Sequence, residues 1–123
     1  MSQLQFNASG DVFFDSKYDG SVRLNRQTWE QHITSRPERA HLKFNTHKIA
    51  TTLVVPDYVR ESRSDGPNVH LYYKEFSIWK RSQDVELPIP SGWKYFVIVV
   101  HTQKKLILTM YETEVPKKGK EVT

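Results

Sequence analysis

A histidine beside apolar anchors is the first residue of this chain that suggests chemistry. In the stretch WEQHITSRPE, His32 follows Trp29 by three residues and stands directly before Ile33. With Arg36, these residues follow the i, i+3, i+4, i+7 spacing of one helix face. His32 is either a packed helix histidine, which is the commoner role, or a general acid or base, because histidine titrates near neutral pH.

Further candidates for a phosphate site lie near His32 and in a later strand. Arg36, one turn beyond His32, either grips a phosphate or is a solvated helix end beside the negative end of the helix dipole. In LILTMYET, the hydroxyls of Thr109, Tyr111 and Thr113 alternate onto one strand face. Such hydroxyls are ordinary on a half-exposed sheet, and they also suit a phosphate-binding or proton-relay site.

An aromatic and basic cluster lies between these two regions. Tyr72, Tyr73 and Lys74 are consecutive, and they predict either cross-strand packing with a snorkelling lysine or base stacking beside a phosphate contact. Arg60 and Arg63 are either solvated or line a groove. Lys117 and Lys118 belong to a basic tail that is most simply solvated and mobile, and that adds at most non-specific attraction for a polyanion.

Composition narrows the function classes. The chain has 123 residues, a net charge of +4, a pI near 9.3 and no cysteine, which indicates one domain and excludes disulfides, thiolate metal sites and a cysteine nucleophile. His41 and His47 lack the spacing of a zinc pair, and we expect neither a metal nor another cofactor. The N-terminus does not resemble a signal peptide, and the longest apolar run is too short for a membrane span. We therefore expect a soluble cytoplasmic protein with no membrane partner.

The elements that must position these side chains follow from local patterns. The segment DVFFDSKYDGSVRLN predicts two strands joined by a turn at Asp19-Gly20. A helix follows that contains Trp29 and ends before Pro37, and a second helical region extends over 38–54, with a break near Phe44-Asn45. Its Leu42, Ile49 and Leu53 lie on one stripe.

Strand patterns dominate the second half of the chain. Tyr58 to Glu61, VHLYYKEF, WKYFVIVVHT and LILTMYET are all predicted strands, and SQDVELPIPSG is a predicted connection. In LILTMYET, Ile107 is expected to share a face with Thr109, and Leu108 to share the opposite face with Met110. Helices followed by strands favour an α+β class, with N-terminal helices packed on a four-stranded antiparallel sheet. We expect a single domain over 1–123, with a core of about 11–115.

The order of the motifs carries a resemblance. The segments that carry it follow one another in this order: RLNRQTW, EQHI..RPE, KIATTLVVPDYVRES, LYYKEF, KYFVIVV and LILTMYETEVPKKGK. With these segments, residues 20–119 resemble the phage and bacterial branch of the barnase–EndoU–colicin–RelE-like (BECR) nuclease group. That group carries two N-terminal helices on a four-stranded antiparallel sheet. It usually has a second histidine between the arginine and the proline, whereas here Arg36 is followed directly by Pro37.

The resemblance implies metal-independent RNA cleavage, in which a ribose 2′-hydroxyl attacks the adjacent phosphate. A toxin or phage-associated role, with an inhibitor or antitoxin protein as a further partner, is part of this expectation. The alternative is a non-catalytic module on the same fold that binds RNA or a protein. The candidate catalytic residues are His32, Lys74, Thr109 and Tyr111. The candidate RNA-binding residues are Arg36, Arg60, Tyr73, Thr113, Lys117 and Lys118.

Overall fold

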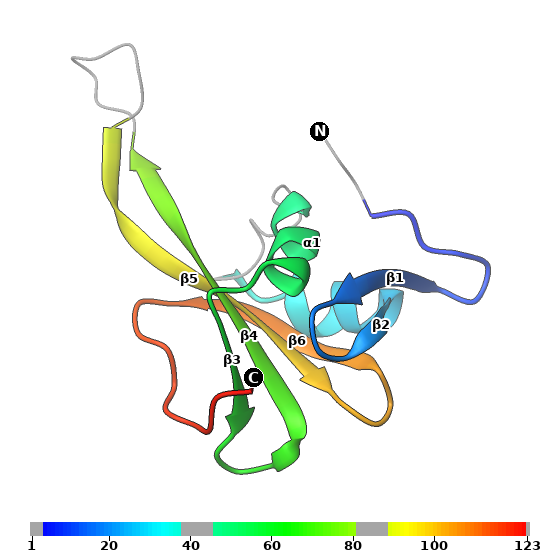
Figure 1. Cartoon of the computed structure of the whole chain (residues 1–123). Helices are drawn as coiled ribbons and strands as arrows, with labels where there is room; N and C mark the ends of the chain where they lie inside the picture. Colours follow the sequence, from blue (N-terminus) through cyan, green and yellow to red (C-terminus); the bar gives the residue numbers. More distant parts are fainter. Residues whose placement is uncertain (1–3, 38–45, 81–88, 123) are drawn as a thin grey trace.

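The computed structural model describes residues 4–37, 46–80 and 89–122, with the backbone alone for 77–80 and 89–93. Its main feature is a curled six-stranded sheet in the order β1-β2-β6-β5-β4-β3 (Figure 1). The strands are β1 (Asp11–Ser16), β2 (Gly20–Asn25), β3 (Tyr58–Ser62), β4 (Gly66–Lys80), β5 (Ile89–His101) and β6 (Leu106–Thr113). A π-helical segment, η1 (Thr28–Ile33), and an α-helix, α1 (His47–Val54), lie between β2 and β3 in the chain.

The expected α+β class, with helices on a four-stranded antiparallel sheet, is wrong because the first hairpin joins the sheet. β2 pairs in parallel with β6 at Arg23 and Leu106, and the Arg23 N–H donates to the Lys105 carbonyl at 2.9 Å. The other neighbouring strands are antiparallel. The result is a mixed, mostly strand fold in which the helical segments are short.

The local predictions of strands are largely confirmed. β1 and β2 form an antiparallel hairpin around the Asp19-Gly20 turn, and Gly20 has a positive φ of 65° that favours glycine. Strands β3, β4, β5 and β6 overlap the four runs expected to be extended, but β4 is longer than VHLYYKEF at both ends and spans Gly66–Lys80. However, β5 already begins at Ile89, inside the segment expected to be a connection, and residues 81–88 of that segment lie outside the described part.

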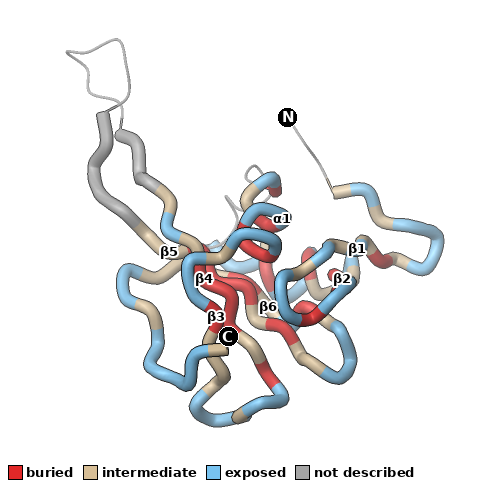
Figure 2. The backbone as a smooth tube through the Cα atoms, viewed as in Figure 1, coloured by how far each residue is buried: buried red, intermediate tan, exposed pale blue. Residues whose placement is uncertain are grey.

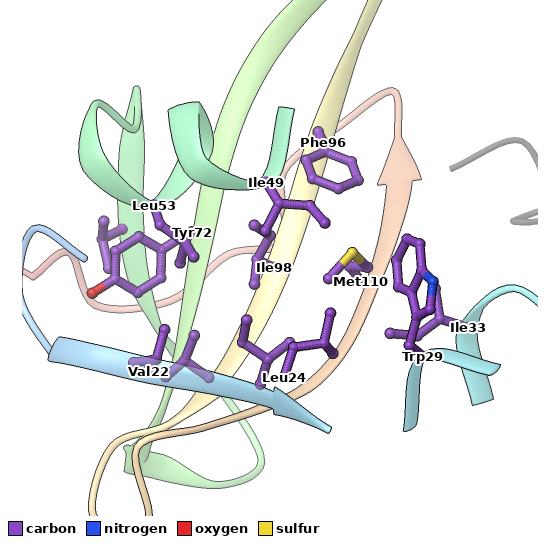
Figure 3. Close-up of a cluster of buried hydrophobic side chains, with 13 residues drawn as sticks. Val22, Leu24, Trp29, Ile33, Ile49, Leu53, Tyr72, Phe96, Ile98 and Met110 are labelled. Carbon is purple, nitrogen blue, oxygen red and sulfur yellow. The ribbon is translucent and has the colours of Figure 1, made fainter. Parts of the chain in front are cut away.

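One face of the sheet, the helix face, carries the main core beneath α1 and η1. The described part of the second helical region is helical only over α1, and the stripe position Leu42 lies outside the described residues. Ile49 and Leu53 are four residues apart on α1 and both are buried. Figure 3 shows how the helical segments and the sheet meet there. The side chains that meet are Ile49, Leu53, Trp29, Ile33, Val22, Leu24, Tyr72, Phe96, Ile98 and Met110.

The helix that was expected to align His32 with its apolar neighbours is a π-type segment instead. The Thr34 N–H donates to the Trp29 carbonyl, five residues back, at 2.8 Å. Trp29 and Ile33 are buried, whereas His32 and Arg36 are exposed. Trp29 and Ile33 face the core while His32 and Arg36 face solvent, so the prediction that all four share one face is wrong for His32 and for Arg36.

A bulge also changes one strand prediction. Val99 pairs with Thr109, but Val100 pairs with Ile107, so that Leu108 is the extra residue of β6. Ile107 is therefore buried in the helix-face core, while Leu108 is 38% exposed. Alternation alone had placed Ile107 with Thr109 and Leu108 with Met110.

A buried carboxylate holds the β1–β2 turn against β4. Asp19 is 3% exposed, and its Oδ2 lies 2.8 Å from Nδ1 of His70 and accepts a hydrogen bond from the Tyr72 hydroxyl at 2.5 Å. The Tyr72 oxygen in turn accepts from the Tyr18 N–H at 3.2 Å. These contacts, which we call the Asp19 clasp, fold the first hairpin across the helix face although its sheet neighbour is β6.

The clasp predicts that stability falls in alkaline solution. Burial raises the pKa of Tyr72 well above its ordinary value, and the hydrogen bond to Asp19 raises it further. An unfolded tyrosine ionises near pH 10, whereas folded Tyr72 keeps its proton to a higher pH. The stability that this hydroxyl contributes is therefore complete below about pH 10. It is lost as the pH rises from there through the folded-state pKa. We expect urea titrations above about pH 10 to show a smaller unfolding free energy. An equal alkaline fall in Tyr72→Phe would contradict this role.

Candidate nucleic-acid interface

The predicted acid or base, His32, lies on the helix side of the sheet. It is exposed on η1, whose Trp29 and Ile33 are inserted in the helix-face core. Arg36 is also exposed, and its Nε donates to the His32 carbonyl at 3.2 Å. The two residues are neighbours, as the sequence predicted, but the contact joins the arginine to the backbone of His32.

The predicted phosphate cation, Lys74, also lies on the helix side but belongs to a different set of contacts. It alternates with Tyr73 along β4 and pairs with Phe96 of the helix-face core. Its Nζ donates to the Val55 carbonyl at 2.9 Å and lies 3.7 Å from Asp57 Oδ1. Lys74 therefore fastens the segment after α1 to the sheet.

The predicted hydroxyl donors point to the opposite side, which we call the groove face. Thr109 pairs with Val99 and Tyr111 pairs with Val97, and Val97 belongs to a second apolar cluster, separate from the helix-face core. The structure therefore brings Thr109 and Tyr111 together but does not bring His32 or Lys74 to them. An acid–base centre made of these four side chains is not assembled.

A groove of about 680 Å³ opens on the groove face, over β4, β5 and β6. Apolar side chains make its floor, and the turn between β3 and β4 and the C-terminal tail make its sides. The floor consists of Val69, Leu71, Val99 and Leu108, and the polar lining consists of Ser62, Arg63, Ser64, Asp65, Thr109, Tyr111, Lys117 and Lys118. Leu71 is 6% exposed and Leu108 is 38% exposed, so the floor is accessible mainly at the β6 bulge.

The groove is basic. Arg63, Lys117 and Lys118 line it, and among the described lining residues Asp65 alone carries a carboxylate. The Lys117 Nζ lies 5.4 Å from the centroid of the Tyr111 ring, a cation–π distance that holds the ammonium group beside the floor. Positive charge, an aromatic ring and an apolar floor thus meet on one concave surface.

The basic tail, predicted to be mobile, follows the edge of β3 (Figure 1, red; its mostly exposed path is visible in Figure 2). The Glu61 N–H donates to the Lys120 carbonyl at 2.7 Å, and the Val122 N–H donates to the Val59 carbonyl at 2.8 Å. Gly119 passes so close to Glu61 that an added Cβ would overlap the Glu61 carbonyl oxygen. The sequence therefore requires glycine at this crossing.

Two residues predicted to contact RNA make contacts that hold the tail. Arg60 donates from Nη1 to the Lys117 carbonyl at 3.1 Å, and its Nη2 lies 3.6 Å from Glu121. Tyr73 is fully buried, and its hydroxyl accepts from the Lys117 N–H at 3.1 Å. Burial raises the pKa of Tyr73 above its ordinary value. Arg60 and Tyr73 thus position Lys117 at the groove.

Of the remaining candidates, Lys118 lines the groove and Thr113 and Arg36 do not. Thr113 Oγ1 donates to the Val115 carbonyl at 3.0 Å where β6 leads into the tail. Ser62, Ser64 and Asp65, which also line the groove, were not among the candidates predicted from the sequence. The pairing of β3 with β4 shifts register at Glu61/Ser62, next to these residues, and no short sequence signal marks that shift.

The Asp19 clasp was also missed. Asp19 was read as a turn residue, and His70 as one position of an alternating strand. A buried carboxylate with two side-chain partners became visible only when the turn and β4 were brought together. Tyr72 had been weighed for packing or base stacking, and in the structure it is fully buried.

Comparisons of the chain with known proteins found no match, so the resemblance to the nuclease group stays a prediction. Among the described residues, no three His, Asp or Glu side chains gather as metal ligands would. In the same part of the chain, no helix is long and apolar enough to cross a bilayer. No protein-family model, no curated protein and no solved structure matches the sequence.

Proposed function

We propose that the protein is a binding module for single-stranded RNA and that the groove holds the strand. The observation that carries the proposal is the convergence of Arg63, Lys117 and Lys118 with Tyr111 over an apolar floor. Proteins that bind single strands combine a positive groove with surfaces on which bases stack. The net charge of +4 has the sign that such a partner requires.

The apolar floor favours a single strand over a duplex. A duplex hides its base faces and presents mainly phosphates and sugars, which gain nothing from contact with Val99 or Leu108. An unpaired base can lie on these side chains while its phosphates meet the cations of the turn and the tail. A volume of about 680 Å³ is within the usual size of a ligand site.

Cleavage is not part of the proposal. Acid–base catalysis needs the acid or base within hydrogen-bond reach of the reacting atoms. His32 is exposed on η1 and Lys74 is fastened to Val55, so neither faces the groove that Thr109 and Tyr111 line. The arrangement supports the retention of RNA rather than its cleavage.

Charge removal in the groove tests the proposal. We expect Arg63→Ala and Lys118→Ala each to weaken binding of a labelled single-stranded RNA. In a plot of the logarithm of the binding constant against the logarithm of the salt concentration, each substitution should also make the slope shallower by about one, because one phosphate contact is lost. Fluorescence anisotropy across a salt series measures both quantities. Arg36→Ala and Lys104→Ala remove the same charge from exposed sites outside the groove, and we expect little effect from them.

The same samples test for cleavage. RNA incubated with the protein in EDTA is expected to stay intact on a denaturing gel. Strand scission that disappears in His32→Ala would overturn the proposal in favour of a nuclease. Equal losses of affinity in the groove variants and the control variants would show that RNA is held by overall charge and not by the groove.

A further inference from the structure

One acidic side chain lies among the lining residues that the structure describes, and the attraction for phosphate does not explain it. Asp65 lies in the turn between β3 and β4 and lines the groove together with Arg63, Lys117 and Lys118. A carboxylate repels phosphate, so it weakens the attraction that these cations provide. Its position is better suited to the part of a nucleotide that carries hydrogen-bond donors, which is the edge of the base.

Asp65 makes only long hydrogen bonds through its carboxylate within the protein, and its side chain is exposed to solvent. Its Oδ2 accepts from the hydroxyls of Ser62 and Ser64, both at 3.3 Å. These distances are long for hydroxyl donors, which prefer about 2.7–2.8 Å, and Ser64 and Asp65 are exposed to solvent. The carboxylate therefore retains acceptor capacity for a ligand, because an ionised carboxylate has about four lone-pair sites.

The floor and the carboxylate fit different parts of one base. Val99 and Leu108 offer apolar contact to the face of a base, while Asp65 at the adjoining turn offers an acceptor to its edge. An ionised carboxylate can only accept, and it pairs with exocyclic amino groups such as N4 of cytosine. A carbonyl oxygen at the same position, as in uracil, meets repulsion instead.

We propose that Asp65 makes the groove selective for bases that carry an exocyclic amino group, and so for cytosine over uracil. This inference rests on the proposed function, because it assigns a base preference to the same groove. Arg63 and the tail lysines hold the phosphates without regard to sequence, and Asp65 supplies the discrimination at one base.

The test compares short oligocytidylate and oligouridylate of equal length, which differ at the 4-amino and 4-oxo groups. We expect the protein to bind oligocytidylate about tenfold more tightly, the lower range of what one base contact contributes. In Asp65→Asn the side-chain amide can donate to the uracil O4, and asparagine also suits a turn. We therefore expect the ratio of the two dissociation constants to fall to about one or to reverse.

Asp15→Asn is the matched control, since it removes the same charge from an exposed position on β1. It should leave the ratio unchanged, even if both affinities rise slightly. Equal binding of the two oligonucleotides by the unmodified protein, or an unchanged preference in Asp65→Asn, overturns the inference and leaves RNA binding standing. Failure to bind either oligonucleotide overturns the proposed function itself.

Discussion

Gly119→Ala is expected to leave the sheet folded and to weaken binding of single-stranded RNA by about tenfold or more at moderate salt. The added Cβ would overlap the Glu61 carbonyl oxygen, so the tail must move away from the edge of β3. Lys117 and Lys118 would then leave the groove, and two phosphate contacts would be lost together. Anisotropy titrations measure the affinity, and circular dichroism checks the fold.

Lys120→Ala is the control for this variant. Lys120 contributes its backbone carbonyl to the Glu61 N–H, and its side chain does not line the groove. Its removal takes away a positive charge but keeps the tail docked, so a much smaller loss of affinity is expected. If Gly119→Ala binds RNA as tightly as the unmodified protein, the tail is not a side of the binding site.

Asp19→Ala is expected to lower the free energy of unfolding by about 2–4 kcal/mol, because two buried polar groups lose their acceptor and each such loss costs about 1–3 kcal/mol. The substitution leaves His70 Nδ1 and the Tyr72 hydroxyl without their shared acceptor. The β1–β2 turn would also lose its side-chain attachment to β4. Urea unfolding monitored by tryptophan fluorescence measures the change.

Asp15→Ala is the matched control on the same hairpin. Asp15 is exposed on β1, and substitutions at such surface positions usually change stability by no more than about 0.5 kcal/mol. A similar, small effect at both positions would mean that the clasp does not stabilise the fold. A large effect at Asp19 alone would confirm that the first hairpin depends on β4 as well as on β6.

Local patterns predicted the strands well, because the alternation of apolar and polar side chains along a strand depends only on neighbouring residues. Leu71 and Tyr73 stand two residues apart in the predicted strand VHLYYKEF, and they lie together on the groove face. The turn at Asp19-Gly20 was predicted from residue types that favour turns. These features need no knowledge of distant parts of the chain.

The fold class failed because it depends on a long-range contact. The pairing of Arg23 with Leu106 joins the first hairpin to the last strand, and neither local sequence indicates the other. The same limit explains the site. His32 and Lys74 were grouped with Thr109 by order along the chain, while a π-turn and strand alternation place them on the other side of the sheet.

The groove itself was predicted only in part. Lys117, Lys118, Thr109 and Tyr111 were singled out by residue type, and all of them line it. The bulge at Leu108, which opens the floor, and the docking of the tail along β3 arise from tertiary packing. No periodicity in the sequence contains that information.

The most direct test of the central claim is a titration of isotopically labelled protein with single-stranded RNA, followed by NMR. We predict that the amide resonances of Leu71, Val99, Leu108, Thr109 and Lys118 shift with RNA concentration. Those of His32, Lys48 and Asp57, on the helix side, should remain in place. Shifts that concentrate on the helix side, or no shifts at all, would contradict the account.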